Sequence, residues 1–166
     1  WYLVKSKNNF FECRIKGKIR LKDISTTNPI AVGDEVEFQM ESDGKGIISD
    51  ILPRVNYIIR KSVNLSKQYH IIASNIDISV LVVTLNNPIT STNFIDRFLV
   101  SCEAYDIPVI IAFNKKDTYI DKESDEIEKL INTYRTIGYK CELISAKYGD
   151  RVDEIIKLIR NKTCII

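Results

Sequence analysis

The ten residues 108–117, PVIIAFNKKD, constrain the fold of this chain more than any other stretch. The apolar run 109–113 follows a proline and precedes four polar residues, a pattern typical of a parallel strand that is covered on both faces. Ligands of open α/β sheets bind at the carboxyl ends of the strands, so residues 114–117 are predicted to lie where a ligand would bind. The alternative interpretation is a solvated turn, because Asn, Lys and Asp are all common in turns.

The polar residues Asn114, Lys115, Lys116 and Asp117 form an N-K-x-D pattern, which resembles the guanine-specificity motif of GTPases. Guanine presents two adjacent donors, a ring N–H and an exocyclic amino group, and the two oxygens of Asp117 can accept from both. Adenine lacks this donor pair, and a site built on paired hydrogen bonds rejects it. The resemblance implies that the stem of Lys115 packs on the base and that Asn114 braces the loop and contacts the base. Lys116 completes the set of candidate nucleotide-binding residues.

A second motif supports the first. The predicted strand 141–144 ends in Ser145, Ala146 and Lys147, and the predicted helix 122–136 separates it from N-K-x-D. In GTPases an S-A-K element follows N-K-x-D by one helix and one strand, and one of its backbone N–H groups meets the guanine oxygen. The order and spacing therefore predict that these three residues belong to the same nucleotide site.

Beyond residue 76, apolar runs of strand length alternate with amphipathic helical segments. The predicted strands are 76–85, 109–113, 141–144 and 163–166, and the predicted helices are 94–105, 122–136 and 152–159. Helical spacing places five side chains of the first helix on one face, namely Phe94, Ile95, Phe98, Leu99 and Cys102. This α/β order predicts a mostly parallel sheet with flanking helices, built from right-handed crossovers.

Residues 1–55 contain several short strand-like runs between turn residues, which predicts a small β-barrel, and we favour an OB-fold. In and just after the run 10–21, cations occupy every second position from residue 14 to residue 22, so an extended chain would place them on one face and mostly apolar residues on the other. These cations are Arg14, Lys16, Lys18, Arg20 and Lys22. Because OB-fold barrels bind nucleic acid on a strand face, we predict that this basic stripe binds RNA; the alternative is a solvated face.

Residues 56–75 are predicted to form a basic linker between the barrel and an α/β domain of residues 76–166. Arg60 and Lys61 lie in this segment, and we assign both to the RNA-binding surface. Residues 1–72 hold 12 Lys/Arg and 8 Asp/Glu, a net of +4, whereas residues 73–166 hold 12 and 14, a net of −2. This asymmetry predicts that the first part meets a polyanion.

A phosphate loop of the form G-x-x-x-x-G-K-[ST] does not occur among these residues. The chain has 6 glycines, and none of them is spaced in that pattern. In ordinary GTPases the loop lies well before N-K-x-D, where this chain has a predicted barrel and linker. The α/β domain is therefore either degenerate or circularly permuted.

The second possibility fits the whole chain, which resembles the RsgA/YjeQ family of circularly permuted, ribosome small-subunit-dependent GTPases. The resemblance lies in four stretches: TTNPIAVGDEVEF, IIRKSVNLSKQYHIIASNID, NFIDRFLVSCEAYDIPVIIAFNKKD and YRTIGYKCELISAK. In that family the base-specificity motifs come first and the phosphate loop follows the strand that corresponds to 163–166. We therefore expect the chain to be a fragment that ends just before this loop.

The resemblance implies a full protein that binds and hydrolyses GTP late in the assembly of the small ribosomal subunit, with the rRNA as a partner. It also implies a cytoplasmic location, Mg²⁺ bound with the nucleotide, and Zn²⁺ in a carboxyl-terminal domain. The guanine-site residues that it carries over are Asn114, Lys115, Asp117, Ser145, Ala146 and Lys147. Catalytic residues have no matching positions here and stay unassigned, so we expect no hydrolysis by this chain alone.

Other functions remain open at this point. The main alternative is a non-catalytic RNA-binding module with a Rossmann-like scaffold domain, and a further alternative is a plain α/β scaffold for protein contacts. No apolar run approaches the roughly 18 residues of a membrane span, so no membrane contact is predicted. The four cysteines are far apart in sequence, which favours buried free thiols over a metal site. A monomer is expected.

Overall fold

The computed structural model describes residues 1–17, 28–61 and 69–166. The chain divides into two compact units, Trp1–Asn75 and Ile76–Ile166. We call them unit 1 and unit 2 and describe each by itself.

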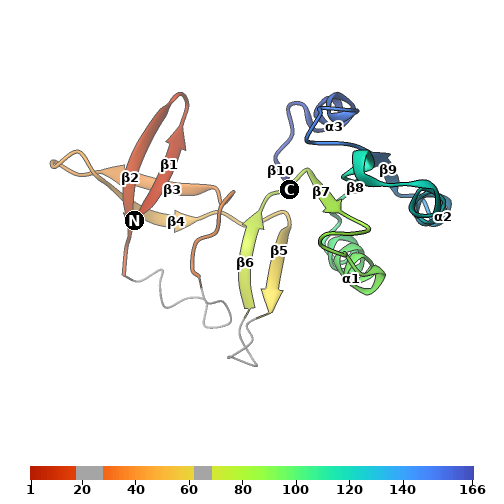
Figure 1. The fold of residues 1–166 in the computed structure, drawn as a ribbon. Coiled ribbons are helices and arrows are strands. Elements are labelled where there is room, and N and C mark those ends of the chain that lie inside the picture. Colours follow the sequence, from red (N-terminus) through yellow and green to blue (C-terminus); the bar gives the residue numbers. More distant parts are fainter. Residues whose placement is uncertain (18–27, 62–68) are drawn as a thin grey trace. The chain divides into compact units, whose positions relative to one another are not determined.

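Unit 1 contains a barrel-like sheet of short strands (Figure 1). Its strands are β1 (Tyr2–Ser6), β2 (Asn9–Ile15), β3 (Val36–Met40) and β4 (Gly46–Ile51), in the order β1-β2-β4-β3. The β1–β2 and β3–β4 pairs are antiparallel, and β2 pairs with β4 in parallel. The core is small: Cys13 and Ile48 are fully buried, and a Cβ at Gly46 would lie 2.5 Å from the Cys13 sulfur. The predicted barrel is confirmed.

Strand β2 shows part of the predicted alternation. Cys13 is buried and Ile15 partly buried, whereas Glu12 and Arg14 are exposed. Strand β2 ends at Ile15 and Lys16 is outside it, so the predicted extended run 10–21 is not one continuous strand. The remaining cations of the stripe, at positions 18, 20 and 22, lie outside the described residues. The exposed side of β2 is mixed in charge, since Glu12 shares it with Arg14.

Two further strands of unit 1 occupy the segment for which the sequence predicts a linker. Strands β5 (Tyr57–Lys61) and β6 (Tyr69–Ser74) form an antiparallel pair. Both runs are rich in isoleucine and tyrosine, which favour strands. The sequence interpretation gave more weight to the polar and basic residues between them and so missed the pairing.

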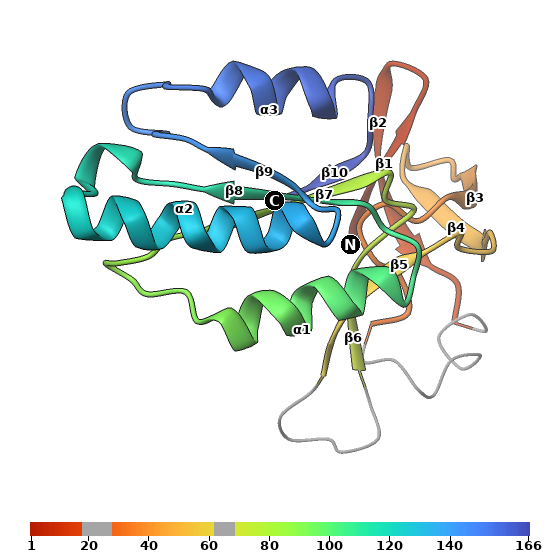
Figure 2. The same ribbon diagram turned by 90° about the vertical axis from the view of Figure 1, so that its right-hand side faces the viewer.

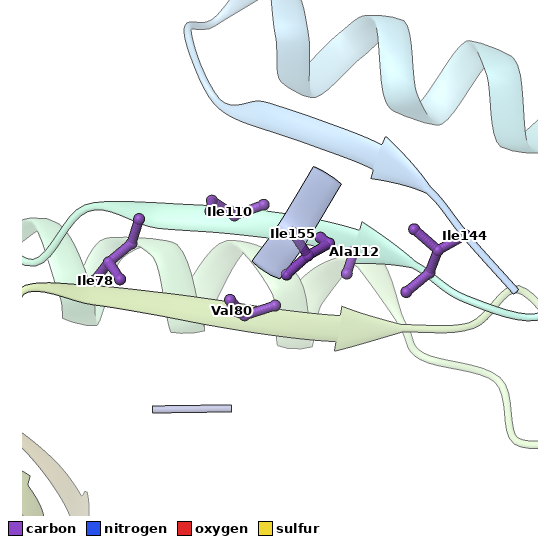
Figure 3. Close-up of a cluster of buried hydrophobic side chains, with 6 residues drawn as sticks. All are labelled: Ile78, Val80, Ile110, Ala112, Ile144 and Ile155. Atoms are coloured by element: carbon purple, nitrogen blue, oxygen red, sulfur yellow. The ribbon is translucent and has the colours of Figure 1, made fainter. Parts of the chain in front are cut away.

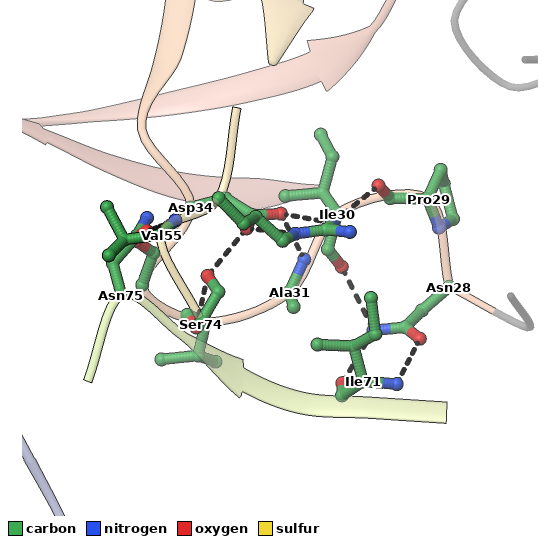
Figure 4. A network of polar contacts seen from close by, with 12 residues as sticks. Asn28, Pro29, Ile30, Ala31, Asp34, Val55, Ile71, Ser74 and Asn75 are labelled. Atoms are coloured by element: carbon green, nitrogen blue, oxygen red, sulfur yellow. Dashed lines mark hydrogen bonds and ion pairs between the residues drawn. The ribbon is translucent and has the colours of Figure 1, made fainter. Parts of the chain in front are cut away.

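A buried polar cluster connects residues 28–34 to β6 (Figure 4). The Asp34 carboxylate accepts hydrogen bonds from Ser74 Oγ (2.6 Å), from the Ala31 N–H (2.8 Å) and from two nitrogens of Arg54 (2.7 and 2.8 Å). Its side chain is 0% exposed. Gly33 has φ +92°, and a Cβ there would lie 2.2 Å from the Ser74 carbonyl oxygen, so this close approach requires glycine.

The side chain of Asn28 extends the same connection. Its Oδ1 accepts from the Ile71 N–H at 3.0 Å and its Nδ2 donates to the Ile71 carbonyl at 2.9 Å (Figure 4). Further along, the Ser74 N–H donates to the Val32 carbonyl. Residues 28–34 therefore act as an additional, irregular edge of the β5–β6 pair.

Unit 2 is an α/β unit whose sheet has the order β10-β7-β8-β9, with every neighbouring pair parallel. Its elements are β7 (Ile78–Val83), α1 (Thr92–Glu103), β8 (Val109–Phe113), the 3₁₀ turn η2 (Lys116–Thr118), α2 (Asp121–Thr136), β9 (Lys140–Leu143), α3 (Val152–Ile159) and β10 (Cys164–Ile165). Helix α3 covers one face of the sheet, and α1 and α2 cover the other (Figure 2). The predicted parallel sheet with flanking helices is confirmed.

Both faces of this sheet are buried, as the continuous apolar strands predict. Alternate residues of β7 and β8 pack with α3 on one face, in a cluster drawn in Figure 3. This cluster comprises Ile78, Val80, Ile110, Ala112, Ile144 and Ile155. On the other face the ring of Phe113 lies 6.4 Å from that of Tyr134 on α2.

The helices begin and end close to their predicted bounds. Ser91 caps α1 by accepting from the Phe94 N–H, and Gly138, with φ +107°, follows the end of α2. Of the five side chains predicted to share one face of α1, Ile95, Leu99 and Cys102 are buried and Phe98 is half-buried, whereas Phe94 is 54% exposed. None of the helices in the described part of the chain combines the length and apolar character that a membrane span requires.

Candidate functional site

The polar residues predicted from the sequence lie at the carboxyl ends of β8 and β9. Strand β8 is buried at all five positions and ends at Phe113. The Asn114 N–H continues the ladder by donating to the Val83 carbonyl at 2.8 Å. Lys115 then adopts a left-handed conformation, with φ 69°, and the 3₁₀ turn η2 carries the chain away from the sheet. We call residues 114–119 the first loop and residues 145–150 the second loop.

Asn114 connects the first loop to the second through its side chain. Its Oδ1 accepts a hydrogen bond from the Ala146 N–H at 2.9 Å. The predicted neighbourhood of N-K-x-D and S-A-K is therefore present. The Ala146 N–H, a candidate donor to a base oxygen, is engaged by Asn114 in this structure.

Asp117 makes a second side-chain link between the loops. Its Oδ1 accepts from the Ser145 hydroxyl at 2.5 Å. Ser145 is only 2% exposed, whereas Asp117 is an exposed residue. A buried hydroxyl thus orients a carboxylate that solvent can reach. Each carboxylate oxygen has two acceptor positions, so this bond leaves acceptor capacity on both oxygens of Asp117.

The three lysines of the predicted site differ in their contacts. Lys115 Nζ donates to the Asn87 carbonyl, which lies after β7. Lys116 Nζ pairs with Asp150 Oδ2 at 2.7 Å, and both side chains are 44% exposed. Lys147 lies with its Nζ 4.9 Å from the ring of Tyr148 in the second loop. The lysines at 115 and 116 therefore tie the first loop to two neighbouring segments.

Sequence reasoning missed two residues of this region. Asp150, which pairs with Lys116, carries no motif. Tyr119 donates from its hydroxyl to the Asn114 carbonyl at 2.6 Å and accepts from the Leu85 N–H at 3.0 Å. Asp150 and Tyr119 are recognised only by their contacts with segments that are distant in sequence, so neither residue could be found from motif spacing alone.

The predicted RNA-binding residues are placed only in part. Arg14 makes a two-oxygen ion pair with Glu41, at 2.8 and 2.9 Å, on the surface of unit 1. Lys16 and Arg60 are exposed. The side chain of Lys61 is not described, and Lys18, Arg20 and Lys22 lie outside the described residues. Of the seven predicted residues, the structure therefore describes the side chains of Arg14, Lys16 and Arg60.

Metal-ligating side chains do not cluster in the part of the chain that the structure describes. Within residues 1–17, 28–61 and 69–166, no three His, Cys, Asp or Glu side chains gather closely enough to hold a metal ion. Cys13, Cys102 and Cys141 are buried free thiols and Cys164 is partly buried. Burial raises the pKa of Cys102 and Cys141 to about 11, so both stay protonated near neutral pH.

Two family models match the chain. The model described as RsgA GTPase covers residues 51–166, and the model described as RsgA N-terminal domain covers residues 1–48. Among curated proteins, the small ribosomal subunit biogenesis GTPase RsgA of Christiangramia forsetii is 56% identical over 170 residues, which is 99% of this chain and 54% of the relative. RsgA 2 of Bacteroides thetaiotaomicron is 53% identical, over 98% of this chain and 53% of that protein. The chain thus spans about half the length of the curated relatives it matches.

Two solved structures resemble the chain over 95% of its length. YjeQ from Thermotoga maritima matches with a TM-score of 0.73 and 29% identity, over 51% of that chain. YloQ, described as a circularly permuted GTPase, matches with a TM-score of 0.68 and 35% identity, over 50% of that chain. Both similarities include the barrel-like unit and the parallel sheet.

Proposed function

The chain belongs to the RsgA GTPase family, and on this premise we propose that the first and second loops of unit 2 bind the base of a guanine nucleotide. The observation that carries the proposal is the hydrogen bond from buried Ser145 to exposed Asp117. It orients a carboxylate with spare acceptor capacity at the carboxyl edge of a parallel sheet, where ligands of such sheets bind.

The residues present fit a guanine base chemically. Asp117 supplies two acceptor oxygens for the adjacent ring N–H and amino group of guanine. Asn114 and the Ala146 N–H lie beside it and can donate to the acceptors of the base, provided that the Ala146 N–H is shared with or released by Asn114. The stem of Lys115, which runs toward Asn87, is available as an apolar surface against the flat face of the base.

We propose further that the full-length protein hydrolyses GTP during biogenesis of the small ribosomal subunit, as the names of its relatives suggest. We propose the cytoplasm as its location. Strand β10 supports the proposed hydrolysis because it pairs in parallel with β7. Its residues Cys164 and Ile165 lie beside Ile78 and Ser79 at the start of β7, and the strand runs toward the edge that holds the two loops. A parallel continuation of this strand would lead to that edge, where a phosphate loop would place the nucleotide phosphates.

The 166 residues by themselves contain no phosphate-loop motif, and we propose that they do not hydrolyse GTP alone. Family resemblance implies Mg²⁺ with the nucleotide and Zn²⁺ in another domain. No three His, Cys, Asp or Glu side chains cluster among the described residues, and neither ion is assigned a ligand here.

Unit 1 is proposed to bind rRNA through its exposed basic residues. Arg14, Lys16 and Arg60 are exposed cations of this unit, and residues 1–72 carry a net of +4 from 12 Lys/Arg and 8 Asp/Glu. Phosphate contacts of this kind position a protein on RNA without specifying sequence. The alternative, an RNA-binding module without nucleotide activity, is separated from the main proposal by the following experiment.

The test is a set of titrations with GDP, XDP and ADP on the full-length protein and its Asp117→Asn variant. In xanthine a carbonyl replaces the exocyclic amino group of guanine, so it matches an amide, which both donates and accepts, better than a carboxylate. We expect the wild type to prefer GDP and the variant to prefer XDP, with a change in the GDP-to-XDP affinity ratio of about 100-fold or more.

Asp106→Asn is the matched control. Asp106 is also exposed, and it lies in the segment before β8, at the opposite edge of the sheet. Its φ of 54° is one that Asn also tolerates. A wild type that binds GDP and ADP equally would sink the guanine proposal and leave the RNA-binding module as the leading function.

A further inference from the structure

The hydroxyl of Tyr119 lies between the ends of β7 and β8, at the point where their ladder stops. The last direct bond runs from the Asn114 N–H to the Val83 carbonyl. In a regular parallel ladder the next bond would run from the Leu85 N–H to the Asn114 carbonyl. Instead, the Leu85 N–H donates to the Tyr119 hydroxyl at 3.0 Å, and that hydroxyl donates to the Asn114 carbonyl at 2.6 Å. One side-chain hydroxyl therefore stands in place of a ladder bond.

This contact also closes the first loop. The left-handed Lys115 and the 3₁₀ turn reverse the chain, and Tyr119 returns to the strand end from which the loop started. Asp117 lies within the closed segment. Its backbone position is thus held by the Tyr119 contact, while Ser145 orients its carboxylate.

Asn114 is held at three points as a result. Its N–H is bound by the Val83 carbonyl, its own carbonyl by Tyr119, and its Oδ1 by the Ala146 N–H. Among the described residues, none accepts a hydrogen bond from Asn114 Nδ2. This amide group is a donor of the kind that the guanine acceptors N7 and O6 require.

The Tyr119 hydroxyl remains a donor under ordinary conditions. Burial raises the pKa of Tyr119 above its ordinary value of 10.0, although the bond from Leu85 partly opposes this. The group therefore stays protonated at neutral pH. A phenylalanine at this position would preserve the ring and remove only the bridge between Leu85 and Asn114.

We infer that Tyr119 is a positioning residue for guanine recognition, which fixes Asn114 and Asp117 by bridging the ends of β7 and β8. The inference rests on the proposed function, because it assigns Tyr119 a role in that same site. It concerns the selectivity of the site for guanine over adenine and involves no contact between Tyr119 and the base.

The experiment compares Tyr119→Phe with Tyr139→Phe in the full-length protein, by titration with GDP and ADP. Tyr139 is the matched control because its hydroxyl is also hydrogen-bonded, to Glu103 at 3.1 Å, and it lies just before β9, at the sheet edge opposite the site. We expect Tyr119→Phe to weaken GDP binding about tenfold, with ADP binding unchanged and the number of binding sites preserved. Tyr139→Phe should leave the GDP-to-ADP ratio at the wild-type value.

A merely structural role predicts a different pattern. Loss of folded protein would lower the binding stoichiometry for both nucleotides and leave their affinity ratio unchanged; either this pattern or an unaltered GDP affinity overturns the inference. The Asp117→Asn variant shows whether only the role of Tyr119 fails or the guanine-binding proposal fails as well. If Asp117→Asn loses guanine preference while Tyr119→Phe keeps it, only the role of Tyr119 fails; if the wild type has no guanine preference, both proposals fail.

Discussion

Each unit of the molecule contains an aspartate that accepts a hydrogen bond from a serine hydroxyl, and the two carboxylates differ in everything else they contact. In unit 1, Ser74 donates to Asp34 at 2.6 Å, and Arg54 and the Ala31 N–H occupy the remaining positions. In unit 2, Ser145 donates to Asp117 at 2.5 Å, and the carboxylate is exposed.

The difference separates a structural carboxylate from one suited to a ligand. Burial by itself would raise the pKa of Asp34, but the hydrogen bonds from Arg54, Ala31 and Ser74 outweigh it and lower the pKa below 3.8. Asp34 is therefore ionised and fully paired within the chain. Among the described residues, Ser145 is the one side-chain hydrogen-bond partner of the exposed Asp117 carboxylate, so its acceptor capacity is available to a bound base.

The largest effect is expected from a substitution that breaks the buried polar cluster of unit 1. Replacing Arg54 by Leu leaves the buried carboxylate of Asp34 without its charge partner, which should lower the free energy of unfolding by about 3 kcal/mol. Urea unfolding of the 166-residue chain, followed by far-ultraviolet circular dichroism so that both units are observed, measures this. Lys116→Ala removes the half-exposed pair with Asp150 and serves as the control, with a decrease below about 1 kcal/mol. Equal decreases in the two variants would contradict the distinction between the clusters.

A smaller effect is expected when each of the two serines is replaced by alanine. Ser74→Ala should lower the free energy of unfolding by about 1 kcal/mol, because Asp34 keeps its other donors. Ser145→Ala should weaken GDP binding by the full-length protein roughly fivefold to tenfold, because Asp117 is no longer held in its orientation. Each variant should leave the other quantity near its wild-type value. A Ser145→Ala protein with normal GDP affinity would show that the second loop does not position Asp117.

The smallest effect concerns the basic residues of unit 1. Removing one cation that binds a phosphate should lower the slope of the logarithm of RNA affinity against the logarithm of salt concentration by about one. We expect Lys16→Ala and Lys18→Ala to show this decrease and Arg14→Ala to show less, because Glu41 already pairs with Arg14. Filter binding to a structured rRNA fragment across a salt series measures the slopes. Unchanged slopes in all three variants would show that the basic stripe of unit 1 is a solvated face that does not bind RNA.

The elements of unit 2 were predictable because their signals are local. Continuous apolar runs indicated the buried strands, and helical spacing indicated α1, α2 and α3. Phe94 belongs to the predicted apolar face of α1 but is 54% exposed. It lies in the first turn of α1 and stacks on Phe98, with 6.5 Å between the ring centroids.

The prediction was weaker in unit 1. Strand β2 ends at Ile15, although the alternating pattern continues to residue 21, and the β5–β6 pair replaces a predicted linker in the described part of 56–75. Alternation and composition describe a single segment, whereas strand pairing requires a partner elsewhere in the chain. The connection of Asn28 to Ile71, 43 positions apart, shows how distant that partner is.

The sequence by itself determined the class of this protein: a barrel joined to a parallel sheet, with N-K-x-D and S-A-K at successive strand ends in the order of the RsgA family. Only the tertiary structure decided which polar atoms are paired and which remain available. Ser145 and Asp117 are 28 positions apart, Leu85 and Tyr119 are 34 apart, and Ser74 and Asp34 are 40 apart. Hydrogen bonds depend on distances of a few ångströms, and no local pattern specifies such distances between segments that meet only after the sheet has formed.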